Sequence, residues 1–253
     1  MATKNTHYNE KLLSSATVSG VIVAAGSGTR MGRVSKPEIL LDGVSLFARV
    51  LQAFDGSCVQ ELVVVCGENR PRLEQIVLEL QPSKPVRFCE GGKTRTESVF
   101  NGVNACAGEN LLICVHDCAR PFVTPEIIEA VISEARKSGA ATACCPVTDT
   151  VKYVDLEHHA VYTPAREHLV ALQTPQVFRR DFYQVAYAVA KGKGASYTDE
   201  TAMLEAAGTS VAYVQTDPRN IKLTTREDLV LARAILAVQK AQNMKQNMKK
   251  GST

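Results

Sequence analysis

The sequence of 253 residues contains no tryptophan, and only 6% of its residues are aromatic. It also has little excess charge, since 29 Lys and Arg stand against 26 Asp and Glu, which leaves a net charge of +3. So small a surplus neither demands nor excludes nucleic acid, and we expect none as a partner. Anionic substrates therefore have to be inferred from the local placement of Lys and Arg.

Long hydrophobic runs are missing as well. No apolar stretch approaches the length of a membrane span, so we expect no membrane partner. Residues 20–26 follow Lys4 and Lys11 and could imitate a signal peptide, but this apolar stretch is short and leads directly into a glycine-rich turn. A buried first strand is the better interpretation. We expect a cytoplasmic protein; residues 1–16 are too short to favour a plastid transit segment and do not rule one out.

The eight cysteines form no C-x-x-C pair, and several, such as Cys114, lie inside apolar runs. A zinc site needs ligands clustered at short spacing, which this sequence does not offer. Buried free thiols in a reducing compartment explain the pattern better than a disulfide framework.

The remaining composition, with 45% hydrophobic and 22% charged residues, is that of a globular protein. Short β-rich runs alternate with helical patterns. The expected strands are 20–25, 62–66, 86–89, 111–116 and 142–147, and the expected helices follow Val44 and cover 70–80, 94–107 and 125–137. This alternation predicts an α/β fold, a Rossmann-like, mostly parallel sheet flanked by helices. Ligands bind at the carboxyl ends of such strands, so the loops after Ala25, Cys89 and His116 should carry the function.

Residues 149–173 interrupt this alternation with two short alternating pieces joined by polar residues. Such a pattern predicts a protruding β-hairpin arm, not a further βα unit. We expect a flexible N-terminal extension over 1–18, one catalytic domain over 19–238 that includes this arm, and a fraying tail over 239–253.

A glycine-rich turn, A-A-G-S-G-T-R-M-G, follows the first expected strand at residues 24–32. Glycines allow backbone N–H groups to approach phosphates closely. The dinucleotide fingerprint requires a glycine where this sequence has Met31. Arg30 and, six residues later, Lys36 place two cations at the turn, which suits a triphosphate better than a dinucleotide. An ordinary glycine turn is the alternative.

A second motif, G-G-K-T-R-T-E-S, covers residues 91–98. It resembles part of a P-loop, but Arg87 occupies the position of the required glycine. What remains is a Gly-Gly turn, including Gly92, that leads into a helix with Ser98 in its first turns. On this motif alone, phosphate binding and a plain helix start are equally open.

A third motif, V-H-D-C-A-R-P, ends the strand expected over 111–116. An aspartate at the carboxyl end of a buried strand is well placed to hold Mg²⁺, so Asp117 is the candidate metal ligand. Arg120 could meet a second anion. A loop cap and a surface ion pair are the alternatives. Thr150, Arg166 and Lys222 are weaker candidates, because such side chains alone are more often solvated.

In order, these segments resemble the 2-C-methyl-D-erythritol 4-phosphate cytidylyltransferase family. The matching pieces run from about Ser19 to Ala237, and they are A-A-G-S-G-T-R-M, S-K-P-E-I-L-L, G-G-K-T-R-T-E-S-V, V-H-D-C-A-R-P-F, P-V-T-D-T-V-K, L-Q-T-P-Q-V-F, Y-T-D-E and N-I-K-L-T. The resemblance implies a homodimeric enzyme that joins CTP to a sugar-alcohol phosphate with Mg²⁺ and releases pyrophosphate.

The resemblance also implies a role for each matching residue. Catalysis falls to Arg30 and Lys36. Nucleotide binding falls to Ala24, Ala25, Gly26, Gly92, Ser98, Asp117 and Lys222, with Asp117 also near Mg²⁺. Acceptor binding falls to Arg120, Thr150 and Arg166, the last two on an arm that reaches the neighbouring subunit.

The sequence departs from the family pattern at four places: Pro37-Glu38 beside the catalytic lysine, Lys93 where an acidic residue is frequent, Cys118, which would place a thiol in the cleft, and Pro164-Ala165. Three rival functions remain. A ribitol 5-phosphate cytidylyltransferase shares these motifs and changes only the acceptor. A non-catalytic nucleotide-binding regulator would not need both Arg30 and Lys36. A Rossmann oxidoreductase is disfavoured by the missing third glycine.

Overall fold

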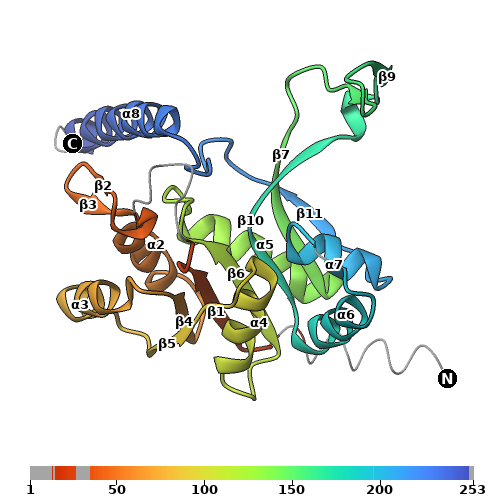
Figure 1. Ribbon diagram of the computed structural model, residues 1–253. Coiled ribbons are helices and arrows are strands. Elements are labelled where there is room, and N and C mark those ends of the chain that lie inside the picture. Colours follow the sequence, from red (N-terminus) through yellow and green to blue (C-terminus); the bar gives the residue numbers. More distant parts are fainter. Residues whose placement is uncertain (1–12, 14, 27–34, 196, 251–253) are drawn as a thin grey trace.

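The computed structural model describes residues 13, 15–26, 35–195 and 197–250, and its centre is a seven-stranded sheet in the order β11-β7-β10-β6-β1-β4-β5 (Figure 1). The strands are β1 (Val18–Val23), β4 (Glu61–Cys66), β5 (Val86–Glu90), β6 (Leu112–Asp117), β7 (Ala140–Pro146), β10 (Val170–Arg179) and β11 (Ala212–Gln215). β5, β4, β1 and β6 run parallel to one another, as do β11 and β7, whereas β10 is antiparallel to both of its neighbours. The predicted α/β class with a mostly parallel sheet is confirmed.

Helices cover both faces of the sheet, also as predicted. One apolar core joins the sheet to α2 (Leu46–Asp55), α3 (Arg70–Leu80) and α5 (Pro125–Ser138). A second core, on the opposite face, joins it to α4 (Arg95–Ala105), α6 (Arg180–Gly192) and α7 (Glu200–Ala206). The long helix α8 (Arg226–Lys250) contributes to a third cluster beside the small β2 (Leu40–Leu41) and β3 (Val44–Ser45) pair.

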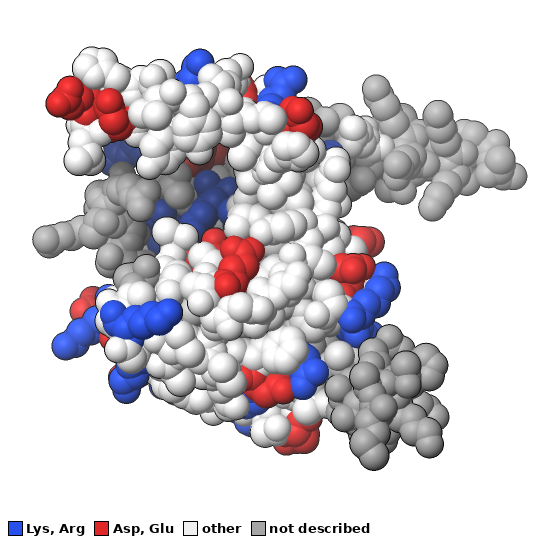
Figure 2. Space-filling model, turned by 90° about the vertical axis from the view of Figure 1, so that its right-hand side faces the viewer, with Lys and Arg blue, Asp and Glu red and all other residues white. Residues whose placement is uncertain are grey.

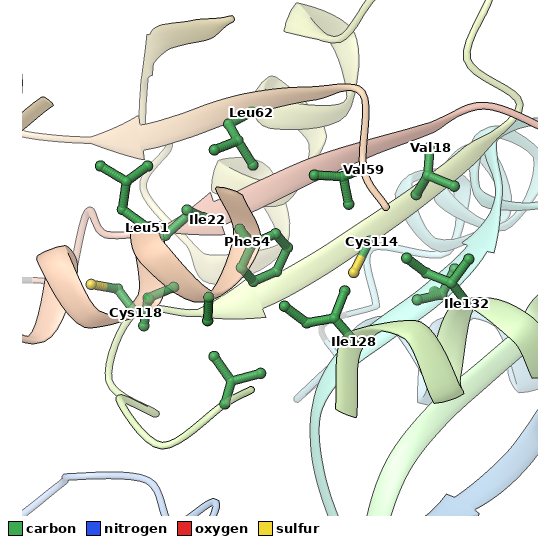
Figure 3. Packing of buried hydrophobic residues seen from close by; sticks show 14 of the residues in the cluster. Val18, Ile22, Leu51, Phe54, Val59, Leu62, Cys114, Cys118, Ile128 and Ile132 are labelled. Carbon is green, nitrogen blue, oxygen red and sulfur yellow. The ribbon is translucent and has the colours of Figure 1, made fainter. Parts of the chain in front are cut away.

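The continuous apolar run of β4 shows why the strands were readable from sequence. Leu62 and Val64 enter the first core, while Val63 and Val65 enter the second, and all four side chains are fully buried. Because successive residues of a strand point to opposite faces, a strand covered on both sides needs apolar residues at every position. Figure 3 shows Leu62 with other side chains of the first core around Phe54.

The predicted boundaries of α5 are confirmed by its capping groups. The Thr124 side chain accepts a hydrogen bond from the backbone N–H of Ile127, and Pro125 occupies the first turn, where its missing N–H is not needed. Gly139 ends the helix at φ 84°, a left-handed conformation that favours glycine.

Most of the elements that the sequence did not predict lie in the second half of the chain, although the short strands β2 and β3 in the first half were not predicted either. β10 begins at Val170, inside the range expected for the arm, and it is followed by α6, α7 and β11. The arm itself contains β8 (Tyr153–Val154) and β9 (Ala160–Tyr162), paired antiparallel and projecting from the sheet (Figure 1). α8 continues to Lys250, through residues where fraying was expected, and β1 begins at Val18.

All eight cysteines lie in the described part of the chain and are free, as predicted. Over the same residues, no helix combines the length and the apolar character that crossing a bilayer requires.

Candidate active site

A cleft of about 470 Å³ opens at the carboxyl ends of β1, β5 and β6, where the functional loops were expected. Its lining residues are Val23, Ala25, Gly26, Lys36, Gly92, Lys93, Thr94, Arg95, Ser98, Asp117, Ala119 and Lys222. Figure 2 shows a hollow in one face of the molecule where Lys and Arg side chains gather. The folding of the chain thus brings five separate sequence segments to one basic cleft.

Small residues form one end of this cleft. Ser98, near the start of α4, accepts a hydrogen bond from the backbone N–H of Gly92 at 3.0 Å and donates to the carbonyl of Thr94 at 2.9 Å. A side chain at Gly91 would place its Cβ 2.5 Å from that of Ala25, so only glycine lets the two loops lie this close. A capping box between Thr94 and Glu97 fixes the helix start beside them.

Ala24, Ala25 and Gly26 were expected to present backbone groups to the nucleotide. Ala25 and Gly26 line the cleft. The backbone of Ala24 is engaged elsewhere, because its N–H donates to the carbonyl of Val65 and its own carbonyl accepts from the Asn69 side chain. Ala24 therefore supports the turn from behind, while its two neighbours face the cleft.

Four side chains of alternating charge lie at the wall of the cleft, and three of them line it. Arg95 donates to Oδ1 of Asp117, with 3.0 Å between Nη2 and that oxygen, and to both carboxylate oxygens of Glu200, at 2.8 and 2.9 Å. Lys222 Nζ lies 2.5 Å from Oδ2 of Asp117. Arg95, Lys222 and Asp117 line the cleft, and Glu200 lies behind them with 2% of its surface exposed.

The pKa values of this group follow from burial and from the paired charges. Burial by itself raises the pKa of Asp117, but the charges of Arg95 and Lys222 outweigh that effect and hold the pKa well below its usual range. Burial raises the pKa of Glu200, and the charge and hydrogen bonds of Arg95 oppose the rise. Asp117 is therefore ionised at neutral pH.

Lys36 enters the cleft from the 3₁₀ turn η2 (Lys36–Glu38). Its Nζ donates to the backbone carbonyl of Leu223 at 3.1 Å, which ties this turn to the segment that carries Lys222. The buried ring of Pro37 anchors the same turn. Arg30, the other expected catalytic residue, lies outside the described residues.

The three expected acceptor-binding residues do not line the cleft of their own chain. Arg120 points inward and donates to the backbone carbonyls of Asn220 and Leu172, at 2.9 and 3.2 Å. Thr150 and Arg166 are exposed on the arm, and Arg166 donates to the carbonyl of Thr148. Arg120 thus braces the segment that leads to Lys222.

The expectation that Cys118 places a thiol in the cleft is wrong. Cys118 has 2% of its surface exposed and packs in the first apolar core, among the side chains around Leu51 (Figure 3). Its backbone N–H donates to the carbonyl of Val23, and burial raises the pKa of the thiol. A buried, protonated thiol is inert, so Cys118 has no part in binding.

His116 is a structural residue, as the sequence suggested. Its ring lies fully buried between Thr174 Oγ1, 2.9 Å from Nδ1, and the carbonyl of Arg120, 3.1 Å from Nε2. Burial lowers its pKa from 6.5 to about 4. The ring therefore stays neutral in the folded protein at neutral pH.

The buried ring of His116 predicts a loss of stability in mild acid. Its pKa is lower in the folded than in the unfolded state, so its contribution to stability is complete above pH 6.5 and is lost as the pH falls towards 4. Between pH 7 and pH 5 this linkage should remove about 2 kcal/mol of unfolding free energy. Urea unfolding of wild type and His116→Gln at both pH values measures the difference, with His168→Gln, on the exposed arm, as control. An equal pH dependence in wild type and His116→Gln would contradict it.

Sequence reasoning missed Arg95 and Glu200. Arg95 is the first residue of α4, inside the quoted G-G-K-T-R-T-E-S motif, and Glu200 ends the quoted Y-T-D-E motif. Both residues are charged and lie in motifs that the sequence analysis had already quoted, and this was the only signal in the sequence that could have pointed to them. Their pairing across 105 positions could not be read from either segment alone.

The cleft suits a polyanion whose binding is helped by a hard cation. Among the residues that the structure describes, Asp117 is the only carboxylate that lines the cleft, and no group of three or more His, Cys, Asp and Glu could hold a metal ion. Mg²⁺ commonly takes one or two protein carboxylates and completes its shell with water and substrate phosphates. A single ionised Asp117, in a cleft that Lys36 and Lys222 also line, fits a Mg²⁺ that arrives with a triphosphate.

Comparison with known proteins gives a consistent result over most of the chain. The family model described as 2-C-methyl-D-erythritol 4-phosphate cytidylyltransferase matches residues 18–238. The enzyme of that name from Bacillus cereus is 39% identical over 223 residues, covering 87% of this chain and 98% of the relative. The enzyme of the same name from Alkaliphilus oremlandii is 37% identical over 222 residues, covering 86% of this chain and 94% of the relative.

Solved structures agree with the sequence relatives. The 4-diphosphocytidyl-2C-methyl-D-erythritol synthase of Anaerococcus prevotii superposes with a TM-score of 0.81 at 27% identity, covering 90% of this chain and 99% of that one. The 2-C-methyl-D-erythritol 4-phosphate cytidylyltransferase of Thermus thermophilus superposes with a TM-score of 0.70 at 31% identity, covering 87% and 98%.

Proposed function

The chain belongs to the 2-C-methyl-D-erythritol 4-phosphate cytidylyltransferase family, and we propose that it joins CTP to 2-C-methyl-D-erythritol 4-phosphate and releases pyrophosphate. The observation that carries this proposal is the set of cations around one ionised carboxylate in a cleft at the carboxyl ends of the strands. Two polyanions have to meet in this reaction, and a basic cleft with small residues at one end suits both the phosphates and a small base.

The reaction is a nucleotidyl transfer, a substitution at the α-phosphorus of CTP. An oxygen of the acceptor phosphate attacks the α-phosphorus of CTP in line, the bond to the β-phosphate oxygen breaks, and pyrophosphate leaves with the electron pair. Catalysis of this kind depends mainly on positioning and on electrostatic stabilisation. In this proposal Lys36, together with Arg30, stabilises the charge that develops on the α-phosphate, and Lys222 orients the phosphates.

Magnesium belongs to this proposal as a cofactor. Asp117 would hold Mg²⁺ together with the triphosphate oxygens, and the ion would supply charge neutralisation for the leaving pyrophosphate. Gly26, Gly92 and Ser98 would then receive the cytidine end of CTP, where Ala25 leaves room for a base. Ala24 would act only by supporting the turn.

A homodimer is proposed as the working form, with Thr150 and Arg166 binding the acceptor phosphate in the neighbouring subunit. The arm supports this idea, because β8 and β9 expose their side chains and contribute no residue to the cleft described above. A cytoplasmic location is proposed from the eight free thiols, which suit a reducing compartment.

The test is pyrophosphate release from CTP with 2-C-methyl-D-erythritol 4-phosphate as acceptor, with mass spectrometry of the CDP-linked product. Ribitol 5-phosphate, in the same assay, tests the closest rival. ATP, GTP and UTP test the nucleotide, and we expect CTP to be preferred. Faster turnover with ribitol 5-phosphate would show that ribitol 5-phosphate is the acceptor. Equal turnover with ATP would show that the cleft does not select cytidine. Binding of CTP without consumption of either acceptor would favour a regulator.

A further inference from the structure

A buried carboxylate lies behind the wall of the cleft, outside the set of residues that line it. Glu200 is the first residue of α7, and both of its carboxylate oxygens accept hydrogen bonds from Nη1 of Arg95. Removing a charge from water is costly unless a partner compensates for it, so a carboxylate 2% exposed requires an explanation. Neither the apolar packing of α7 nor the capping of this helix needs Glu200.

The surroundings of Glu200 hold it firmly in place. Asp199, not Glu200, caps α7, because its side chain accepts the backbone N–H of Ala202. The backbone N–H of Glu200 donates to Oε1 of Gln176, a residue of β10 that is itself 1% exposed. Glu200 is thus fixed both to the helix and to the central sheet, which makes it a rigid anchor for whatever it binds.

Arg95 transmits this anchor to the cleft. The two guanidinium nitrogens that do not face Glu200, Nε and Nη2, lie 3.2 and 3.0 Å from Oδ1 of Asp117. Asp117 Oδ2 faces Lys222 instead. The four side chains alternate in sign and balance in charge, so loss of the carboxylate at Glu200 would leave one excess positive charge beside the cleft.

We propose that Glu200 is a positioning residue, which anchors Arg95 so that Arg95 holds the Asp117 carboxylate at the cleft wall and is kept away from the bound phosphates. The turnover measurements that test this inference rest on the proposed function. A released Arg95 would turn towards the triphosphate and stabilise the ground state, while Asp117 would lose its fixed orientation. The substitution should therefore slow turnover without weakening the binding of CTP.

The first experiment compares Glu200→Gln with Glu205→Gln. Glu205 lies on the same helix but is exposed and accepts from the Tyr213 hydroxyl, which makes it a matched control. Glu200→Gln should lower kcat about tenfold or more, within the range of coupling between contacting residues, while the CTP Kd from calorimetry stays unchanged or falls. Glu205→Gln should leave both unchanged. Equal weakening of kcat and of CTP affinity would show a distorted cleft and overturn the proposal, as would wild-type turnover of Glu200→Gln.

The second experiment asks whether Glu200 acts through Arg95. In Arg95→Met the carboxylate of Glu200 loses its partner and becomes an unpaired buried charge. Adding Glu200→Gln to Arg95→Met should therefore raise the unfolding temperature and leave kcat unchanged. In wild type the same substitution should lower the unfolding temperature. A further drop of kcat in the double variant, by the factor seen for Glu200→Gln alone, would mean that Glu200 acts independently of Arg95.

The two experiments separate this proposal from the proposed function. If wild type fails to turn over 2-C-methyl-D-erythritol 4-phosphate, the proposed function is wrong, and the unfolding temperatures and the CTP Kd values still test the link between Glu200 and Arg95. If Glu200→Gln does not fold, the comparison of Arg95→Met with Arg95→Met/Glu200→Gln tests the proposal, because the double variant has no charge imbalance.

Discussion

Replacement of Lys36 by alanine is expected to lower turnover by about 100- to 1000-fold, the usual loss when a preorganised transition-state donor is removed. Lys36 lines the cleft, and it is held there by the buried ring of Pro37 in its turn and by the hydrogen bond from its Nζ to the carbonyl of Leu223. Steady-state kinetics should show kcat and kcat/KM for CTP falling together, because the interaction strengthens only as charge develops on the α-phosphate. The KM for the acceptor should change far less.

Two controls accompany Lys36→Ala. Lys137→Ala removes an exposed lysine of α5 that is paired with Glu134 and does not line the cleft, so it should leave turnover unchanged. Because Lys36 also donates to the carbonyl of Leu223, the unfolding temperature of Lys36→Ala shows whether the fold is retained. Near-normal turnover of a folded Lys36→Ala would make this lysine peripheral. The same loss is expected for Arg30→Ala.

The first half of the fold was predictable because its physics is local. Runs such as residues 62–66 are short, rich in valine and apolar at every position, which is typical of a strand covered on both faces. Thr124, Pro125 and Gly139 mark the ends of one helix. The second half was missed at β10. The middle of β10 reads Q-T-P-Q, so the strand lacks a steady alternation of apolar residues, and its pairing with β7 shifts register there, between Leu172 and Gln176.

The candidate site shows the same division between local and distant information. Asp117 and Lys222 were expected near phosphates because each lies in a distinctive segment, and the structure brings them 2.5 Å apart. Cys118 was misplaced because the chain turns sharply after β6, with the N–H of Arg120 donating to the carbonyl of Asp117, and this turn sends the thiol back into the core. The direction of one side chain in a turn is a property of three-dimensional packing that the motif does not encode.

The arm raises the question of where Arg166 acts. Leu156 is fully exposed, and Tyr153, Val161 and Tyr162 each expose more than half of their surface, so the arm presents apolar side chains that a partner could cover. Arg166 lies at the base of the same arm, outside the cleft of its own chain. In a two-fold dimer in which one arm reaches the partner's cleft, the other arm does the same, because an isologous contact is made twice.

Subunit exchange tests this arrangement with two complementary mixtures. Lys36→Ala and Arg166→Ala should each be nearly inactive alone, and in their mixed dimer one cleft receives both lesions while the other receives neither. Random exchange of equal amounts should therefore restore about a quarter of the wild-type clefts. If Arg166 acts within its own chain, every cleft keeps one lesion and no activity returns, provided that tag capture confirms exchange.

The reciprocal mixture should lose activity for the same reason. When wild type is mixed with an equal amount of the double variant Lys36→Ala/Arg166→Ala, about half of the clefts are intact before exchange. In a mixed dimer, action across the dimer leaves the wild-type cleft without a partner arginine and the variant cleft without its lysine, so both are inactive. The active fraction should fall from about a half to about a quarter. Action within one chain predicts no change, because each wild-type subunit keeps its own complete set. Recovery in the first mixture without loss in the second would contradict the dimer arm, since both follow from the same geometry.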